Sequence, residues 1–361
     1  MIRIFTRSPY IVSVNNVSQT GSKIELFIYP GGGTPPASPT YTLSKLIPGT
    51  SVTENLYNIS PYLREYLTHK LNGMNYNTIN DLTELDEYTY VDVNTYNLIG
   101  GVYVLDSSFT ARCYDGYGYY EDMTNVDRGD ILLGEDDYYY WSDSNNTPAI
   151  IAAHRAGIVT AYLGKDYFVT YTNQNNGAIV TNNYPTAGVY DLYRVHPPYY
   201  GARVLMQIYN STSVLLWQSR FIPKEECRYT PMAIDFINKF GGWQREFFYK
   251  ASYEQLNVTN TTYNLMMPDI LPMTMSIGQR AVFNANGIRR YTMNTGWVDE
   301  TYAETMQQLL LSERVIWVDG NYRIPVKVVT NSINKQKNIN NKTINYSIEI
   351  ELAFDVINSV I

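Results

Sequence analysis

Cysteine, histidine and charged side chains are all scarce in this chain of 361 residues. The two cysteines, Cys113 and Cys227, are far apart and form no C-x-x-C pair, which argues against a disulfide framework and against a zinc site. The three histidines, His69, His154 and His196, lie in separate regions, and none has a second potential ligand at helical or hairpin spacing. We therefore expect no metal centre and no histidine-based catalysis.

Long apolar runs are missing as well. No segment approaches the roughly 18 consecutive apolar residues that span a membrane. The first residues (1–14) contain no uninterrupted apolar stretch and no small-residue cleavage site, so they do not resemble a signal peptide. Neither PGGG (30–33) nor DGYG (115–118) lies between a strand and a helix with a Lys-Ser/Thr pair following, so a phosphate-binding loop is not expected. These absences predict a protein without a membrane partner that is synthesised in a cytoplasm.

Charged residues make up only 17% of the chain, and the formal net charge is −7. This balance lacks the basic footprint of a dedicated nucleic-acid binder. Aromatic residues, in contrast, reach 14%, and 35 residues are tyrosine. Because tyrosine joins an apolar ring to a polar hydroxyl, it suits half-buried strands and protein contacts. The composition predicts a folded protein that is mainly β, and it argues against disorder.

Residues 1–87 are predicted to form an N-terminal β-sandwich with one short helix. The segment 23–29 (KIELFIY) alternates apolar and polar side chains, runs into a loop rich in glycine and proline, and is followed by a second strand pattern. A helix is expected over 58–68, where Ser60 serves as the N-cap and Pro61 occupies the first helical position. A short helix lying against a sandwich accounts for this combination.

Residues 88–225 are predicted to form a second all-β domain. Within it, 203–221 is interpreted as two strands joined by a short polar loop. Two dipeptides, Asp115-Gly116 and, in the following region, Asn286-Gly287, are signals of tight turns. The second domain also carries an insertion rich in aspartate and tyrosine near 121–150.

The insertion contains the one cluster of acidic residues that could hold a metal: Glu121, Asp122, Asp127, Asp130, Glu135, Asp136 and Asp137. Oxygen ligands of this kind suit Ca²⁺, but their spacing does not match the roughly 12-residue calcium loop with its glycine and terminal glutamate. A solvated acidic loop is the favoured interpretation, and a docking surface for a basic partner is the alternative. No metal and no cofactor are therefore predicted.

Residues 226–361 are predicted to form an α+β domain, in which one helix covers an antiparallel sheet. The helix is expected over 298–312, with Leu309 and Leu310 in its apolar stripe. The segment 344–356 (INYSIEIELAFDV) places an apolar side chain at every second position, which predicts a long strand with one buried face. We expect that face to pack on Leu309 and Leu310.

The polar face of the same strand carries Glu349 and Glu351. Paired carboxylates can hydrolyse glycosidic bonds, but these two share one strand face with no apolar pocket in view that would tune an acid, so solvation is favoured. The preceding loop (331–342) is interpreted as a solvated hairpin tip or, alternatively, as a contact with an acidic partner surface or a phosphate backbone. It contains no acid, and its basic residues are Lys335, Lys337 and Lys342.

Three segments of the last third resemble virion structural proteins of tailed phages that infect Bacteroidetes, the crAss-like phages among them: 226–252, 294–317 and 338–357. The strand, loop and helix patterns within 24–67 fit the same group. Trp243 and Trp297, each of which follows a turn that contains glycine, match the pattern as structural anchors.

The resemblance implies a non-enzymatic component of the tail or of the rings below the portal, present in many copies in the virion and synthesised in the host bacterial cytoplasm. Its partners would be copies of itself in a closed ring, together with neighbouring tail, collar or portal proteins. DNA could pass through the lumen without sequence recognition. No catalytic residue is carried over, because the shared pattern is one of turns and packing.

We therefore predict that the polar face or exposed edge of 344–356 and the loop 331–342 meet adjacent copies, since closed rings use head-to-tail contacts that can cover strand edges. The candidate assembly contacts are Lys335, Lys337, Lys342, Glu349 and Glu351. A host-facing carbohydrate- or receptor-binding protein is the alternative, with the tyrosine-rich stretch 114–141 as its surface. An enzyme such as a glycosidase would need two carboxylates that face each other across a cleft.

Overall fold

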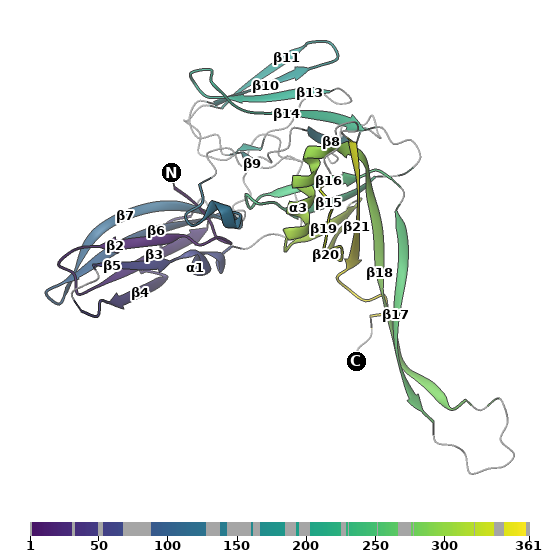
Figure 1. Ribbon diagram of the computed structural model, residues 1–361, viewed down its shortest axis with the longest axis horizontal. Coiled ribbons are helices and arrows are strands. Elements are labelled where there is room, and N and C mark those ends of the chain that lie inside the picture. Colours follow the sequence, from purple (N-terminus) through teal and green to yellow (C-terminus); the bar gives the residue numbers. More distant parts are fainter. Residues whose placement is uncertain are drawn as a thin grey trace.

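The chain is mainly β, as predicted, with several sheets and one helix in its C-terminal part (Figure 1). An N-terminal sandwich, a middle sheet and a C-terminal sheet follow one another along the sequence, and a two-stranded arm projects from the last of them (Figure 1). The computed structural model describes residues 2–30, 33–49, 53–67, 88–127, 138–142, 160–161, 167–184, 193–194, 203–224, 229, 231–250, 252–265, 276, 278–320, 322–335 and 343–358.

The N-terminal part packs a five-stranded sheet on a two-stranded one. The larger sheet has the order β1-β7-β6-β3-β4, with β1 Ile2–Phe5, β3 Gly21–Pro30, β4 Tyr41–Leu46, β6 Tyr88–Ile99 and β7 Val102–Tyr114. The smaller sheet pairs β2 (Ile11–Asn15) with β5 (Glu54–Asn58), and the helix α1 (Ser60–Arg64) follows it. Both sheets and the helix share one core. Its fully buried side chains come from each of them: Val14 of β2, Ile24 of β3, Leu63 of α1 and Val91 of β6.

Strands β6 and β7 belong to this sandwich, so the predicted domain boundary between residues 87 and 88 is wrong. Strand β6 pairs antiparallel with the whole of β3, from Gly21 opposite Leu98 to Pro30 opposite Thr89. Its other edge pairs with β7. The pairing joins segments that are far apart in the sequence, and a change of local composition does not reveal it.

The β6–β7 hairpin reverses at Gly100-Gly101, and the prediction of a turn at Asp115-Gly116 is wrong. Both residues of the actual turn have positive φ, 60° and 83°, which glycine adopts without a steric penalty. Asp115-Gly116 lies instead just after the end of β7, where the chain meets the C-terminal part.

The helix predicted over 58–68 is present but shorter, since α1 ends at Arg64. Ser60 does not act as an N-cap. Its hydroxyl donates to the Ser8 carbonyl at 2.6 Å and accepts from the Tyr10 N–H at 2.9 Å. The helix start is therefore tied to the β1–β2 connection and not to its own first turn.

The middle part contains a five-stranded sheet of order β11-β10-β13-β14-β8 and a two-stranded sheet of β9 and β12. The strands are β8 Tyr138–Ser142, β9 Thr160–Ala161, β10 Tyr167–Asn173, β11 Ile179–Tyr184, β12 Tyr193–Arg194, β13 Val204–Tyr209 and β14 Leu215–Lys224. The two strands predicted within 203–221 are confirmed as the β13–β14 hairpin. One face of β13 is buried, because Val204, Met206 and Ile208 are fully covered.

The C-terminal part is a seven-stranded antiparallel sheet of order β16-β15-β19-β20-β21-β18-β17. The strands are β15 Met232–Ile237, β16 Trp243–Phe248, β17 Tyr253–Asn264, β18 Arg280–Asp299, β19 Val315–Asp319, β20 Tyr322–Val328 and β21 Thr343–Leu352. A short 3-10 turn, η2 (Glu300–Tyr302), leads into the helix α3 (Ala303–Leu311). The helix lies against the sheet, as predicted (Figure 1).

Strand β21 confirms the predicted alternation and its packing on Leu309. Its apolar residues Ile344, Tyr346, Ile348, Ile350 and Leu352 are all buried, and they share one core with Met306 and Leu309 of α3. Leu310, in contrast, is only half-buried. The strand stops at Leu352, so Phe354 and Val356 lie beyond it and are exposed.

Asn286-Gly287 is not a turn but lies within the twenty-residue strand β18. Gly287 stands opposite Val258 of β17, and a Cβ added to it would come within 2.9 Å of Leu256 Cδ1. A residue without a side chain suits this position, because a Cβ would crowd Leu256 and the Asn257 carbonyl oxygen, a role that the dipeptide signal does not distinguish from a turn.

Candidate functional site: assembly surfaces

The polar face of β21 has a cationic partner within its own sheet. Strand β21 pairs with β18 from Thr343 to Glu351 and with β20 at residues 350–352. Arg290 of β18 approaches Glu351 at 3.1 Å and Glu349 at 3.7 Å. The role of both glutamates as assembly contacts stays a prediction.

Of the three lysines in the loop 331–342, only Lys335 lies among the described residues. It is half exposed, and its Nζ lies 3.8 Å from Glu304 Oε2 of α3. Lys337 and Lys342 lie outside the described residues. The position of Lys335 brings the start of this loop against the helix.

The two tryptophans that are predicted to be structural anchors have opposite environments. Trp243 is 3% exposed and packs with Ile237 and Ile316 in a small cluster, as a structural anchor does. Trp297 is 60% exposed, so the expectation of an anchor in the core is not met. It lies beside a register shift between β18 and β21, where the strand bulges and turns its side chain outward.

The acidic cluster is described only in part. Glu121 and Asp122 belong to a single exposed 3-10 turn, η1 (Tyr120–Asp122), in which the Asp122 carboxylate accepts from the Tyr119 N–H at 2.7 Å. Asp127 is exposed, whereas the remaining members, Asp130, Glu135, Asp136 and Asp137, lie outside the described residues. Within the part of the chain that the structure describes, no three histidine, cysteine, aspartate or glutamate residues are grouped as a metal site.

The cysteines and histidines give no nucleophile in the described residues. Cys113 lies in the core of the sandwich, and burial raises the pKa of its thiol, which favours the unreactive protonated form. Cys227, His69, His154 and His196 lie outside the described residues.

The aromatic stretch 114–141 is mostly turned inward where it is described. Tyr114 and Tyr117 are buried, and Tyr119 is engaged in a contact with α3. Tyr120, by contrast, is 93% exposed. Residues 114–119 therefore form a contact between two parts of the chain and not an open aromatic platform.

The β15–β16 turn (238–242) inserts into the end of the N-terminal sandwich. Phe240 at its tip is 2% exposed, although it is a turn residue. It packs in one apolar cluster with Phe5, Tyr88, Tyr114 and Val126. We call this contact between the N-terminal and C-terminal parts the joint.

Two glycines let the backbones approach closely at the joint. Gly241 has a φ of 84°, and a Cβ on it would lie 2.7 Å from the Asp115 backbone nitrogen. A Cβ on Gly116 would collide with the Lys239 carbonyl oxygen. With both glycines present, the Tyr117 N–H donates to that carbonyl at 2.8 Å. Gly116 therefore serves close packing between two parts of the chain, which explains why its turn signal misleads.

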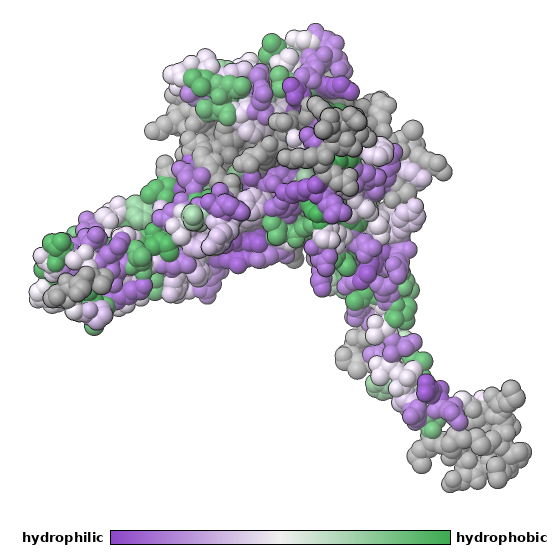
Figure 2. Space-filling view, in the orientation of Figure 1, coloured by the Kyte–Doolittle hydropathy of each residue, from purple (hydrophilic) through white to green (hydrophobic). Residues whose placement is uncertain are grey.

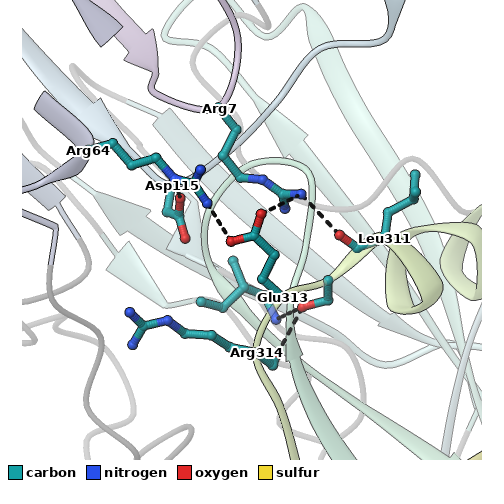
Figure 3. Close-up of polar contacts among 8 residues, drawn as sticks. Arg7, Arg64, Asp115, Leu311, Glu313 and Arg314 are labelled. Atoms are coloured by element: carbon teal, nitrogen blue, oxygen red, sulfur yellow. Dashed lines mark hydrogen bonds and ion pairs between the residues drawn. The ribbon is translucent and has the colours of Figure 1, made fainter. Parts of the chain in front are cut away.

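A cluster of charged side chains also links the two parts of the chain at the joint (Figure 3). Glu313, just after α3, lies between two arginines of the N-terminal part, with Arg7 Nη2 at 3.4 Å from its Oε1 and Arg64 Nη2 at its Oε2. Arg7 also donates to the Leu311 carbonyl at 3.1 Å, and Arg64 lies 3.4 Å from Asp115 Oδ1. One glutamate thus ties the β1–β2 connection and the end of α1 to the end of α3.

Glu304 of α3 makes a second polar link across the joint. It accepts a hydrogen bond from the Tyr119 hydroxyl at 2.6 Å and lies 3.4 Å from Nζ of Lys239, whose side chain is 2% exposed. Burial alone would raise the pKa of Glu304. The hydrogen bond from Tyr119 and the positive charge of Lys239 outweigh burial, so that the pKa lies below its ordinary value.

A further exposed element among the described residues is the arm, which we define as residues 256–264 of β17 and 280–289 of β18. Strand β21 pairs with β18 only from Arg290 onward, so the arm is a ribbon of two strands (Figure 1). The one backbone bond from outside the ribbon is donated by the Val356 N–H to the Gly287 carbonyl at 2.7 Å, among the described residues. At 3.4 Å per residue, ten residues extend about 34 Å beyond the sheet.

Apolar side chains on the arm face the solvent. Figure 2 shows hydrophobic patches along it, interleaved with polar surface. The exposed large apolar residues are Leu256 (53%), Val258 (60%), Tyr263 (49%), Val282 (55%) and Phe283 (67%). No strong sequence signal marks this segment, because 253–264 shows no clean alternation and is dominated by asparagine and threonine.

No protein-family model matches the chain, and no curated protein matches it. Neither α1 nor α3, nor any other described helix, is long and apolar enough to cross a membrane. The functional inference therefore rests on the geometry of the chain itself.

Proposed function

We propose that this chain is a non-enzymatic structural component of a bacteriophage virion, a tail or portal-proximal ring protein that self-assembles and connects neighbouring tail proteins. The observation that carries the proposal is the arm. Residues 355–357 bond to Asn286 and Gly287 of the arm, but no other described strand pairs with it. An isolated two-stranded ribbon is marginally stable at best in water. A partner in the assembly supplies the missing cover.

The joint suits a mechanical role. Phe240 and the Glu313 ion pairs fasten the N-terminal and C-terminal parts to each other, while each part keeps a core of its own. A subunit of a ring transmits force between neighbours, and it needs a fixed angle between the surfaces that it presents to them. A buried apolar contact surrounded by ion pairs supplies that rigidity.

The proposal is tested by the mass and shape of the purified protein. Sedimentation velocity and negative-stain electron microscopy should show a large annular species in place of a 41.4 kDa monomer. Mass spectrometry of the virions encoded by the same genome should find the chain in many copies per particle. A protein that stays monomeric at all concentrations, or one absent from the virions, would overturn the proposal.

A second candidate, carbohydrate or receptor binding, is favoured by a groove on the N-terminal sandwich. The groove has a volume of about 560 Å³ and is lined by Phe27, Asp92, Asn94 and Phe109 among others. Aromatic rings and a carboxylate in an open groove suit a sugar, although Asp92 already accepts from Thr110 at 2.6 Å. Titration calorimetry with host surface oligosaccharides tests this candidate, and Phe109→Ala should abolish any heat of binding that the groove produces.

A further inference from the structure

The N-terminal sandwich has an unpaired strand edge of its own. Strand β1 pairs with β7 only opposite residues 111–114, so 102–110 has no neighbour on that side among the described residues. The exposed large apolar side chains on this stretch are Val102 (64%), Tyr103 (39%), Val104 (50%) and Leu105 (56%). We call residues 102–110 the β7 edge.

The β7 edge lacks most devices that keep edges from pairing. Free edges are commonly blunted by lysine, by proline or by a bulge. The stretch 102–110 contains no lysine and no proline, and its single register shift leaves Asp106 out of the ladder. The Asp106 carboxylate is held by Asn97 Nδ2 at 2.9 Å. The free edge of the arm, residues 256–264, is equally unprotected, since it contains neither lysine nor proline and has one register shift.

The two edges match in length and in charge. Nine residues of the β7 edge span about 30 Å, close to the length of the arm. The arm contains two arginines, Arg280 and Arg289, and no acid, although Arg289 pairs with Glu254 at its base at 3.5 Å. The β7 edge contains one acid, Asp106, and no basic residue, and Asp92 of the adjacent β6 is a second acid, although Lys23 Nζ of β3 lies 5.0 Å from the ring centre of Tyr103. Opposite charges favour the encounter of the two surfaces and their orientation.

The two edges also lie on different parts of the molecule. The end of β7 at Tyr114 lies in the joint, so Val102 is at the far end of the sandwich, whereas the arm leaves the opposite side of the C-terminal sheet (Figure 1). A twofold contact of arm with arm would cover one edge and leave the other open. A head-to-tail contact covers both in every copy and closes into a ring when the rotation allows it.

Resting on the proposed function, we infer that the arm of one copy adds to the β7 edge of the next copy, so that the five-stranded sheet of the sandwich continues into the neighbouring subunit. Backbone hydrogen bonds between the added strand and β7 would supply affinity, and the exposed apolar side chains of both stretches would cover each other. The partner at this surface is therefore a second copy of this chain.

The test uses two variants of the full chain, each with one surface blocked. Val258→Glu with Phe283→Glu places acids on the arm, where they would face the acidic β7 edge. Val104→Lys with Leu105→Lys places bases on the β7 edge, where they would face the basic arm. Val17→Lys is the matched control, since Val17 is 87% exposed and lies in neither surface. Circular dichroism and a thermal melt establish that each variant is folded.

The expected result is that the wild type and the Val17→Lys control form a closed oligomer, whereas each blocked variant alone is monomeric. In a 1:1 mixture, the intact arm of the edge variant meets the intact β7 edge of the arm variant, and the introduced glutamates of one chain face the introduced lysines of the other, so species of at least twice the 41.4 kDa chain mass should form. Sedimentation velocity reads all of these masses.

The other outcomes overturn the inference in distinguishable ways. A wild type that is monomeric contradicts the proposed function together with this contact. If the wild type assembles and either blocked variant still does so, or if the mixture stays monomeric, the pairing of arm and β7 edge is wrong while the proposed function stands. If the edge variant alone forms dimers and the arm variant is monomeric, the arms pair with each other and the head-to-tail contact is wrong.

Discussion

Replacing Phe240 by alanine should uncouple the two end parts of the chain without unfolding either of them. The ring is 98% covered, by a cluster drawn almost wholly from the N-terminal sandwich. Removing a buried phenylalanine side chain costs about 3–5 kcal/mol, from the lost transfer of the ring and the cavity that it leaves. The core of the sandwich and the core under α3 contain other residues, so both remain intact.

The loss should appear as lost cooperativity. In the wild type, the joint lets the two end parts unfold in one transition, whereas in Phe240→Ala the weaker part should melt first and scanning calorimetry should resolve an additional transition. Limited proteolysis should cut the variant between the two parts earlier than the wild type. Tyr120→Ala is the control, because Tyr120 is 93% exposed near the same site and its removal should change stability by about 0.5 kcal/mol or less. A Phe240→Ala variant with the melting profile and cleavage pattern of the control would refute the account of the joint.

Three further predictions concern the C-terminal part. Because the folded pKa of Glu304 is lowered, its negative charge stabilises the fold at pH values above the ordinary pKa of 4.5, and this stabilisation is lost as the pH falls through the folded pKa. Glu304→Gln should therefore be less stable than the wild type at pH 7, and the two melting temperatures should converge in acid. A difference that stays constant with pH would contradict the prediction. Asp235→Ala should lower the free energy of unfolding, measured with denaturant, by about 3–5 kcal/mol. Arg245 Nη2 lies 2.7 Å from Asp235 Oδ2, and the substitution removes that carboxylate from a buried arginine. A loss below about 1 kcal/mol would contradict the prediction. In the same assay, Leu309→Ala should lower the free energy of unfolding by about 2–5 kcal/mol, and Leu310→Ala should lower it clearly less, because Leu310 is only half-buried. Equal losses would show that α3 does not face the sheet as described.

Local patterns in the sequence were sufficient where the structure itself is local. The alternation of 344–356 predicts β21 and its buried face, because a side chain at every second position is all that a strand with one covered face requires. The Gly241-Gly242 turn and α3 follow from equally short signals. The conformation of each of these elements depends on residues a few positions away in the sequence, or on having one face buried and one face exposed.

Pairing between distant segments was not predictable in the same way. The register of β6 with β3 decides that residues 88–114 belong to the sandwich, and it depends on two strands separated by a helix and a long connection. Gly116 and Gly287 each give the sequence signal of a turn, although both lie at close contacts between backbones, because glycine is common in turns and at such contacts alike. The sequence shows that a small residue is required, but only the packing partner shows which role it has.

The polarity of Glu349 and Glu351 does not by itself mark a contact between copies, for a related reason. An alternating strand has a polar face whether or not that face is free, and here Arg290 of the adjacent strand occupies it. The arm was missed because its exposure follows from where β21 stops, at the level of Arg290, and not from its own residues. Candidate contacts between copies are therefore better sought where a ladder ends than where a strand is polar.

Ring closure connects the joint with the two edges. If the arm of one copy pairs with the β7 edge of the next, the rotation between neighbours is set by the angle between these two surfaces within one chain. That angle is fixed by the contact of Phe240 with the sandwich and by the ion pairs of Glu313 with Arg7 and Arg64. Because a head-to-tail contact closes only when the rotations sum to a full turn, a loosened joint should allow several ring sizes and open chains. In micrographs, Phe240→Ala should therefore broaden the distribution of ring diameters while the contact between copies persists, and a variant with uniform rings of wild-type diameter would show that something other than the joint fixes the angle.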